Sequence, residues 1–123
     1  MEYKEFIEIL KPDFEFKDDR GSLTQLVSCG FSQINVIRAL SGCKRGGHYH
    51  RVNDEAFYVI DGSLTLVARF DNKEKRYEFK KGDMFLIKRC VAHDLIFTSE
   101  TLMVSMYDKG VEIGDGEMDI YKG

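Results

Sequence analysis

Long apolar runs are missing from this chain of 123 residues. None approaches the roughly 20 residues that a membrane-spanning helix needs, so the sequence predicts no membrane association. The first residues alternate charged and apolar side chains and lack the apolar centre of a signal peptide. These two absences together favour a cytoplasmic protein.

Cysteine is also scarce, and its arrangement excludes a disulfide framework. The three cysteines, Cys29, Cys43 and Cys90, are odd in number, widely spaced and form no C-x-x-C pair. We therefore expect buried free thiols in a reducing compartment.

An excess of positive charge is absent as well. Eighteen Lys and Arg residues face 21 Asp and Glu residues, which gives a net charge of -3. This balance provides no electrostatic reason to expect a nucleic-acid partner. A hydrophobic content of 43% and a charged content of 32% are typical of a folded globular protein, and the length predicts a single domain over residues 1–123.

Short runs rich in apolar and β-branched residues recur along the chain, and Gly, Asp and Asn separate them. Such regular spacing predicts an all-β fold, either a sandwich or a small antiparallel barrel. Asp61-Gly62 is a two-residue turn signal between two alternating runs. Residues 3–10 could form a short helix or a strand ended by Pro12, and the acidic tail 111–123 has a possible short closing element. The expected strands cover residues 14–16, 22–27, 34–40, 56–60, 63–70, 76–79, 84–88, 93–99 and 101–107.

All three histidines of the chain fit one constellation with a glutamate. His48 and His50 are two positions apart, so on a strand their side chains point to the same face. Glu55 begins the next apolar run and His93 begins a later one. Three imidazoles and one carboxylate suit a divalent transition metal with positions open for chemistry. Incidental histidines, or a histidine site that works without metal, remain the alternatives.

The spacing of these residues resembles the cupin superfamily. The first cupin motif, G-x5-H-x-H-x4-E-x6-G, is matched at every position. In the second motif, G-x5-P-x-G-x2-H-x3-N, the first glycine and the histidine are present, but Lys88, Cys90 and Phe97 replace the other three residues. We therefore expect the turn before the histidine to be built differently. The matching residues are Gly42, His48, His50, Glu55 and Gly62 in the first motif, and Gly82 and His93 in the second.

The resemblance implies a single cupin domain, a small antiparallel β-barrel of the jelly-roll type that usually forms a homodimer. It also implies a metal inside the barrel, with zinc favoured and iron, manganese or nickel as alternatives. The metal ligands would be His48, His50, Glu55 and His93.

Two further segments resemble cupins that act on nucleotide-linked keto-sugars. "DDRGSLTQL" (18–26) is similar to the D-x-R-G opening of such enzymes, and "RGGHYH" (45–50) is similar to a segment of keto-sugar 3,5-epimerases and 3,4-ketoisomerases. The run from residue 34 to residue 62 also resembles the zinc-binding cupin of capsule-biosynthesis enzymes. The resemblance implies an epimerase or isomerase of a nucleotide-linked 4-keto-sugar in surface-polysaccharide synthesis.

The resemblance to the epimerases also implies roles for single residues. His48 would be the catalytic base and Tyr107 the acid that returns a proton. A nitrogen that binds a metal cannot act as a base, so the two roles of His48 exclude each other. Arg20, Arg45 and Arg38 are candidates for binding the diphosphate, because a guanidinium forms bidentate hydrogen bonds. The alternatives are solvated charges, and for the glycines beside Arg45 a turn with positive φ.

Two other functions remain open at this point. The same donors suit iron or manganese, and thus a cupin dioxygenase, although oxygen chemistry does not require "DRG" or "RGGHY". A non-catalytic cupin that binds a sugar or a metal would need no acid or base. A Tyr107 directed away from the pocket would favour this last function.

Overall fold

The computed structural model describes residues 5–123. These residues form only β-strands and loops, so none of the described segments is a helix that could cross a membrane. The strands are β1 (Ile7–Leu10), β2 (Phe14–Asp18), β3 (Gly21–Gln25), β4 (Gln33–Ala39), β5 (Lys44–Tyr49), β6 (Glu55–Asp61), β7 (Ser63–Phe70), β8 (Lys73–Lys80), β9 (Met84–Ile87), β10 (Ala92–Phe97), β11 (Thr101–Tyr107), β12 (Glu112–Gly114), β13 (Glu117–Met118) and β14 (Tyr121–Lys122).

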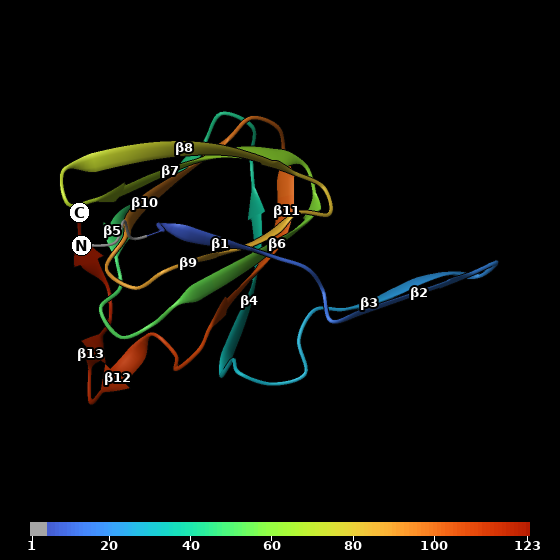
Figure 1. The fold of residues 1–123 in the computed structure, drawn as a ribbon, viewed down its shortest axis with the longest axis horizontal. Coiled ribbons are helices and arrows are strands. Elements are labelled where there is room, and N and C mark those ends of the chain that lie inside the picture. Colours follow the sequence, from blue (N-terminus) through green and yellow to red (C-terminus); the bar gives the residue numbers. More distant parts are fainter. Residues whose placement is uncertain (1–4) are drawn as a thin grey trace.

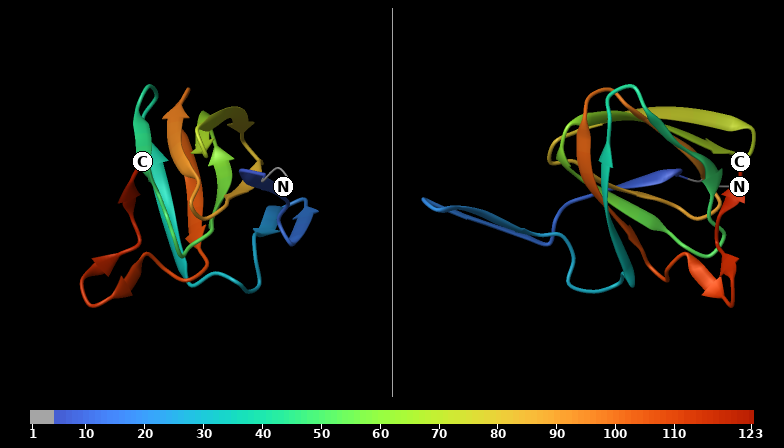
Figure 2. Two further views of the ribbon diagram at one scale, coloured as in Figure 1. Left: turned by 60° about the vertical axis from the view of Figure 1, so that its left-hand side comes forward. Right: turned by 180° about the vertical axis from the view of Figure 1, so that it is seen from behind.

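Two antiparallel five-stranded sheets make up the body of the molecule (Figures 1 and 2). Their strand orders are β1-β9-β6-β11-β4 and β14-β5-β10-β7-β8. The inward residues of both sheets form the main core, with Phe57 and Phe85 from one sheet and Leu64 and Leu66 from the other, each at most 1% exposed. Burying one such side chain contributes about 1.5–3 kcal/mol. The prediction of an all-β jelly roll is confirmed, and a single domain over 1–123 stays a prediction.

The two-residue turn that the sequence predicted at Asp61-Gly62 connects the two sheets rather than neighbouring strands of one sheet. Asp61-Gly62 leads from β6 in the first sheet to β7 in the second. Gly62 is required there, because a Cβ would lie 2.5 Å from the Glu100 carbonyl oxygen. The hairpin in this region is instead β7–β8, across Asp71 and Asn72 with φ of 53° and 61°. Two successive residues at positive φ are typical of a type I′ hairpin turn.

Both ends of the chain add strands to these sheets. Residues 7–10 of the segment with the ambiguous pattern form β1, whereas residues 3 and 4 lie outside the described residues. In the tail, β14 pairs with β5 through Tyr121 and Tyr49, so the expected closing element exists.

The three cysteines are all exposed and unpaired, so the expectation that they are buried is wrong. They lie outside the strands, in the loops around Cys29 and Cys43 and in the turn around Cys90, where no side chain has to fill the core.

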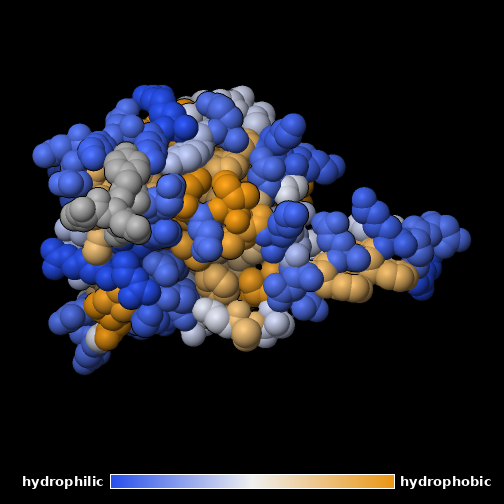
Figure 3. Space-filling model, in the orientation of Figure 1, coloured by the Kyte–Doolittle hydropathy of each residue, from blue (hydrophilic) through white to orange (hydrophobic). Residues whose placement is uncertain are grey.

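The β2–β3 hairpin projects from the body as an arm (Figure 1). Phe16 and Leu23 face each other across it, and they are 49% and 57% exposed. Phe14 lies on the same face two residues away and is 52% exposed. Figure 3 shows apolar side chains along one side of this arm and on the adjoining body. The arm is therefore amphipathic, although no described residue covers its apolar face.

Candidate metal and active site

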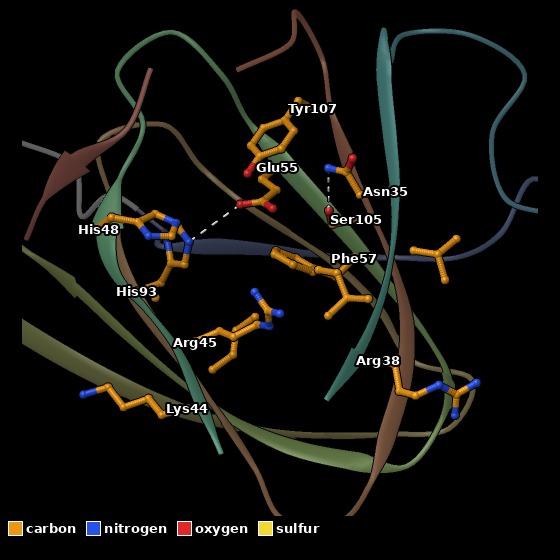
Figure 4. A pocket seen from close by; sticks show the side chains of 14 residues that line it. Asn35, Arg38, Lys44, Arg45, His48, Glu55, Phe57, His93, Ser105 and Tyr107 are labelled. Atoms are coloured by element: carbon orange, nitrogen blue, oxygen red, sulfur yellow. Dashed lines mark hydrogen bonds and ion pairs between the residues drawn. The ribbon is translucent and has the colours of Figure 1, made fainter. Parts of the chain in front are cut away.

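The two facing sheets bring the four predicted donors together. His48 and His93 are direct partners across β5 and β10, and their ring centroids lie 4.9 Å apart. His50 follows β5 with its ring 5.0 Å from that of His48, as the two-residue spacing predicted. Glu55 approaches from β6 in the opposite sheet (Figure 4). We refer to His48, His50, Glu55 and His93 as the four-donor cluster.

Gly46 allows β5 and β10 to approach closely beside this cluster. A Cβ at Gly46 would lie 2.4 Å from the carbonyl oxygen of His93, and the residue has a φ of 121°. The register between the two strands also shifts between His93 and Asp94. The glycine is thus required by the neighbouring strand and by positive φ.

The four-donor cluster has the composition and spacing of a transition-metal site. One ligand atom from each residue lies within 4.8 Å of the other three. Glu55 Oε1 is 3.1 Å from His50 Nε2 and 3.7 Å from His93 Nε2. Bonds of ~2 Å to a single ion place its ligand atoms roughly 3–4 Å apart, so the residues present could hold a divalent metal.

Two of the histidines are oriented by backbone carbonyl groups. His50 Nδ1 lies 2.6 Å from the carbonyl oxygen of Asp119, and His93 Nδ1 lies 3.1 Å from that of Val91. A carbonyl oxygen only accepts hydrogen bonds, so each Nδ1 carries a proton. In both residues Nε2 is directed toward Glu55.

The three histidines differ in the direction in which their surroundings shift the pKa. Burial lowers the pKa of His93 to about 4, and it lowers the pKa of His48 with a further contribution from the nearby His50. For His50 burial acts in the same direction, but the hydrogen bonds to Glu55 and to Asp119 outweigh it and raise the pKa. His48 and His93 are therefore neutral at neutral pH, as ligands or a base must be.

Tyr107 stands beside Glu55, its partner across β6 and β11. Burial, followed by the charge of Glu55 and a hydrogen bond to it, holds the pKa of the Tyr107 hydroxyl above its usual range. Tyr107 also lines the cavity next to the cluster, so it is not directed away from the pocket (Figure 4). A protonated hydroxyl at this place can donate a proton or a hydrogen bond.

A cavity of about 620 Å³ opens between the sheets at the cluster. Its size lies within the range of ~300–1,000 Å³ typical of small-molecule sites. His48, Glu55, His93 and Tyr107 line one end of it. Asn35 and Ser105 add polar groups on another wall, with Asn35 Nδ2 at 3.4 Å from Ser105 Oγ. Sequence reasoning missed these two residues, because polar residues on alternating strands carry no signal of a cavity.

The three predicted arginines lie in different places. Arg45 extends into the cavity, and no described acidic residue forms an ion pair with it (Figure 4). Arg38 lies at the rim with its guanidinium directed away from the cluster and 3.3 Å from Glu100. Arg20 lies at the tip of the projecting arm and pairs with Asp18. Arg38 and Arg45 both line the cavity of their own chain, and of the two only Arg45 directs its guanidinium into it.

Cys90 occupies the place of the second-motif glycine in the turn before His93. Its φ is 70°, and its backbone N–H donates a hydrogen bond of 2.6 Å to the His50 carbonyl. Cys90 thus adopts the left-handed conformation that glycine adopts most easily, and the expectation that this turn is built differently stays a prediction.

These features define a class of protein: a small jelly roll with three histidines and a glutamate facing its interior. Residues 37–108 match the family described as the cupin domain. The chain belongs to this cupin family, as the motif spacing predicted. A comparison with curated protein sequences finds no match.

Solved structures share the fold at low sequence identity. QdtA, a sugar 3,4-ketoisomerase from Thermoanaerobacterium thermosaccharolyticum in complex with TDP, superposes with a TM-score of 0.79 at 16% identity, over 96% of this chain and 88% of that one. A 3,4-ketoisomerase from Helicobacter canadensis gives 0.78 at 18%, over 95% and 90%. The dTDP-4-dehydrorhamnose 3,5-epimerase from Sulfolobus tokodaii gives 0.71 at 20%, over 87% and 72%.

Proposed function

We propose that this cupin is an isomerase or epimerase of a nucleotide-linked 4-keto-sugar. One observation carries the proposal. A single cavity is lined at one end by three members of the four-donor cluster, His48, Glu55 and His93, and by Tyr107. The guanidinium of Arg45 extends into the same cavity without an acidic partner among the described residues. The similarity in fold to a sugar 3,4-ketoisomerase that binds TDP and to a dTDP-4-dehydrorhamnose 3,5-epimerase supports the same substrate class.

We also propose that the four-donor cluster binds a divalent metal, with zinc as the first candidate and iron, manganese or nickel as alternatives. When bound, such an ion supplies Lewis-acid polarisation of a ketone oxygen. Histidine nitrogens with one carboxylate oxygen are typical zinc ligands. His48 is either the fourth ligand or the base, and the metal content of a His48→Asn variant distinguishes these roles.

Side chains of the protein carry out the proton transfers and bind the diphosphate. A carbon beside the ketone loses a proton to the base, which leaves an enolate. Return of a proton to the other face of that carbon is epimerisation. In isomerisation a proton is instead added to the former ketone carbon, while the hydroxyl proton of the first carbon is lost and the former ketone oxygen gains a proton, so the carbonyl moves to the first carbon. The protonated hydroxyl of Tyr107 is the proposed acid. Arg45 binds the diphosphate, whose oxygens suit its planar guanidinium.

A homodimer gives Arg20 a role that its own chain does not offer. Arg20 lies at the tip of an arm that projects from the body and exposes an apolar face. A two-stranded hairpin is marginally stable alone in water, so we propose that this face packs against a second copy and brings Arg20 to the partner's cavity. In such a dimer Arg38, at the rim, is the third candidate contact to the nucleotide.

The test starts with metal analysis of the purified protein. The protein is then incubated with dTDP- and UDP-linked 4-keto-6-deoxy-sugars in deuterated water. We expect deuterium at a carbon beside the carbonyl, and the position of the carbonyl in the product separates an isomerase from an epimerase. Absence of exchange with every such sugar would contradict the proposal. Oxygen consumption without exchange would instead indicate the dioxygenase. Exchange restricted to sugars that occur in surface polysaccharides would support a role in the synthesis of those polysaccharides. Cell fractionation tests the expected cytoplasmic location.

A further inference from the structure

The C-terminal segment contributes to the site through His50. The carbonyl oxygen of Asp119 accepts a hydrogen bond of 2.6 Å from His50 Nδ1, across 69 positions of sequence. His50 Nε2 is then left facing Glu55 Oε1 at 3.1 Å. By contrast, the carbonyl that orients His93 belongs to Val91, only two residues away. The orientation of His50 thus depends on a remote segment, whereas that of His93 is local.

The side chain of Asp119 holds this segment against the loop that follows His50. Asp119 is 0% exposed. Its Oδ1 accepts from the backbone N–H of Arg51 at 2.9 Å, and its Oδ2 accepts from those of Val52 and Asn53, both at 3.0 Å. The side-chain amide of Asn53 donates the fourth hydrogen bond that the carboxylate accepts, to Oδ2 at 2.9 Å. The three backbone donors follow His50 directly in the chain, so one carboxylate fixes both the loop and the tail.

Asn53 extends this buried network to the loop that follows β11. Its Oδ1 accepts from the backbone N–H groups of Lys109 and Gly110, each at 2.9 Å, and its amide donates to the Gly110 carbonyl at 2.8 Å. Every group around the Asp119 carboxylate is a donor, so only an acceptor with two oxygens satisfies them all. In an Asp119→Asn variant, the side-chain NH₂ group would face at least one of these N–H donors and could not accept its hydrogen bond.

We propose that Asp119 is the positioning residue that fixes the ring orientation and the Nδ1–H tautomer of His50. It acts through its main-chain carbonyl, which its side chain holds in place, and it does not touch the substrate. The inference rests on His50 belonging to the proposed metal site, but it concerns the state of the ring before any metal binds. Groups that orient ligating histidines in this way raise metal affinity.

The test reads the tautomer directly. Long-range ¹H–¹⁵N correlation spectra of the metal-free protein report which ring nitrogen is protonated, and the chain has only three histidines to assign. Above the titration of His50 we expect the Nδ1–H tautomer in the wild type. Asp119→Asn and Asp119→Ala should give a tautomer mixture at His50 and leave His93 unchanged. Zinc affinity, measured by chelator competition, should fall ~10–100-fold.

Asp115→Asn is the matched control, because Asp115 is an exposed acid in the same tail. It should change neither the tautomer nor the zinc affinity. An Nε2–H tautomer of His50 in the wild type would overturn the proposal even if no Asp119 variant folds. Unchanged His50 tautomer and zinc affinity in both variants would also overturn it. A wild type with the Nδ1–H tautomer that takes up no zinc supports the positioning role while it contradicts the metal site.

Discussion

The hydroxyl of Tyr107 is the group whose removal best separates catalysis from binding. Tyr107→Phe keeps the ring that packs at right angles to His50 and removes only the proposed acid. Because general acid catalysis contributes ~10²–10⁴-fold, we expect kcat to fall by that factor while metal content is unchanged. Steady-state kinetics with the sugar identified by deuterium exchange measures the loss.

The pH profile of the same reaction provides a second measure. The pKa of Tyr107 is raised, so the hydroxyl stays protonated through its ordinary titration near pH ~10. Loss of its proton should therefore not lower kcat below that pH. Tyr58→Phe is the control, because Tyr58 lies on the other face of β6 and packs against a separate group of buried apolar side chains, which are Ala56, Met84, Val104 and Met106. A Tyr107→Phe variant with the kcat of this control would exclude Tyr107 as the acid.

Glu55 is the only carboxylate among the four donors, so its neutralisation tests the metal site. Glu55→Gln keeps the shape of the side chain but removes the charge that balances a divalent ion. Since loss of an orienting neighbour alone costs ~10–100-fold in affinity, we expect at least such a loss for a ligand, measured by chelator competition. Glu78→Gln changes an exposed carboxylate bound to Thr65 and should leave affinity unchanged. Equal affinity in the two variants would remove Glu55 from the ligand set.

At the scale of residues, the sequence predicts the four donors but not the groups that orient them. The spacing of His48 and His50, with the motif positions of Glu55 and His93, is sufficient to bring four donors together. Nothing distinguishes Asp119 from the exposed Asp115 in the sequence of the same acidic tail. The difference is created only when the chain folds back on residues 51–53 and buries one carboxylate among backbone donors.

At the scale of elements, the contact between β5 and β10 depends on one missing side chain. Gly46→Ala would place a Cβ 2.4 Å from the His93 carbonyl oxygen, at a φ of 121°. Because backbone atoms of a paired strand cannot move aside easily, we expect the free energy of unfolding to fall by more than ~2 kcal/mol. Urea unfolding measures the change, and metal content should fall with it.

Gly47→Ala, at the following residue, provides the matched control. A Cβ there would meet only Asp94 Oδ1 at 3.8 Å, and the φ of 73° costs about 1–2 kcal/mol for a residue other than glycine. Gly47→Ala should therefore destabilise the protein less than Gly46→Ala. The reverse order would show that the approach of β10 does not determine the need for glycine.

The turn before His93 should gain stability from a single substitution. Cys90 holds a φ of 70°, so Cys90→Gly relieves backbone strain while it leaves the backbone hydrogen bond to His50 in place. The entropy lost by glycine offsets part of the gain, and we expect a net increase of about 0.5–1 kcal/mol in the free energy of unfolding. Cys90→Ala removes the exposed thiol without relieving the strain and should be neutral. An equal gain from both variants would assign the effect to the thiol.

Strand positions could be predicted from the sequence, but strand partners could not. Alternation and turn residues mark β6 and β7 on either side of Asp61-Gly62. The same local chemistry serves a hairpin and a corner between sheets, because both need only a sharp reversal with positive φ. Which one forms depends on how both sheets bury their apolar faces, and this is a property of the whole chain. The sequence did not predict the β7–β8 turn at Asp71-Asn72. The first half of β8 consists of charged residues, so it shows no alternation of apolar and polar residues that would mark a strand after the turn.

At the scale of the whole molecule, the arm predicts an oligomer. If its apolar face packs on a second copy, Leu23→Asp should convert a dimer into a monomer, because a charge would be buried against apolar surface. Light scattering after size exclusion should give twice the chain mass for the wild type and the single mass for the variant. Ser22→Asp adds the same charge on the opposite face of the arm and should stay dimeric. A monomeric wild type would contradict the homodimer.

The hydrogen bond between His50 and Asp119 has a consequence for biosynthesis. At ~5–20 residues per second, the 69 positions between them take roughly 3–14 seconds to synthesise. During this interval a nascent chain already carries His48, His50 and Glu55, while the carbonyl that orients one of these rings has not yet been made. The proposed site is therefore complete only after residue 119 has been synthesised, so any ion that it binds in its finished form is one available to the chain after that point.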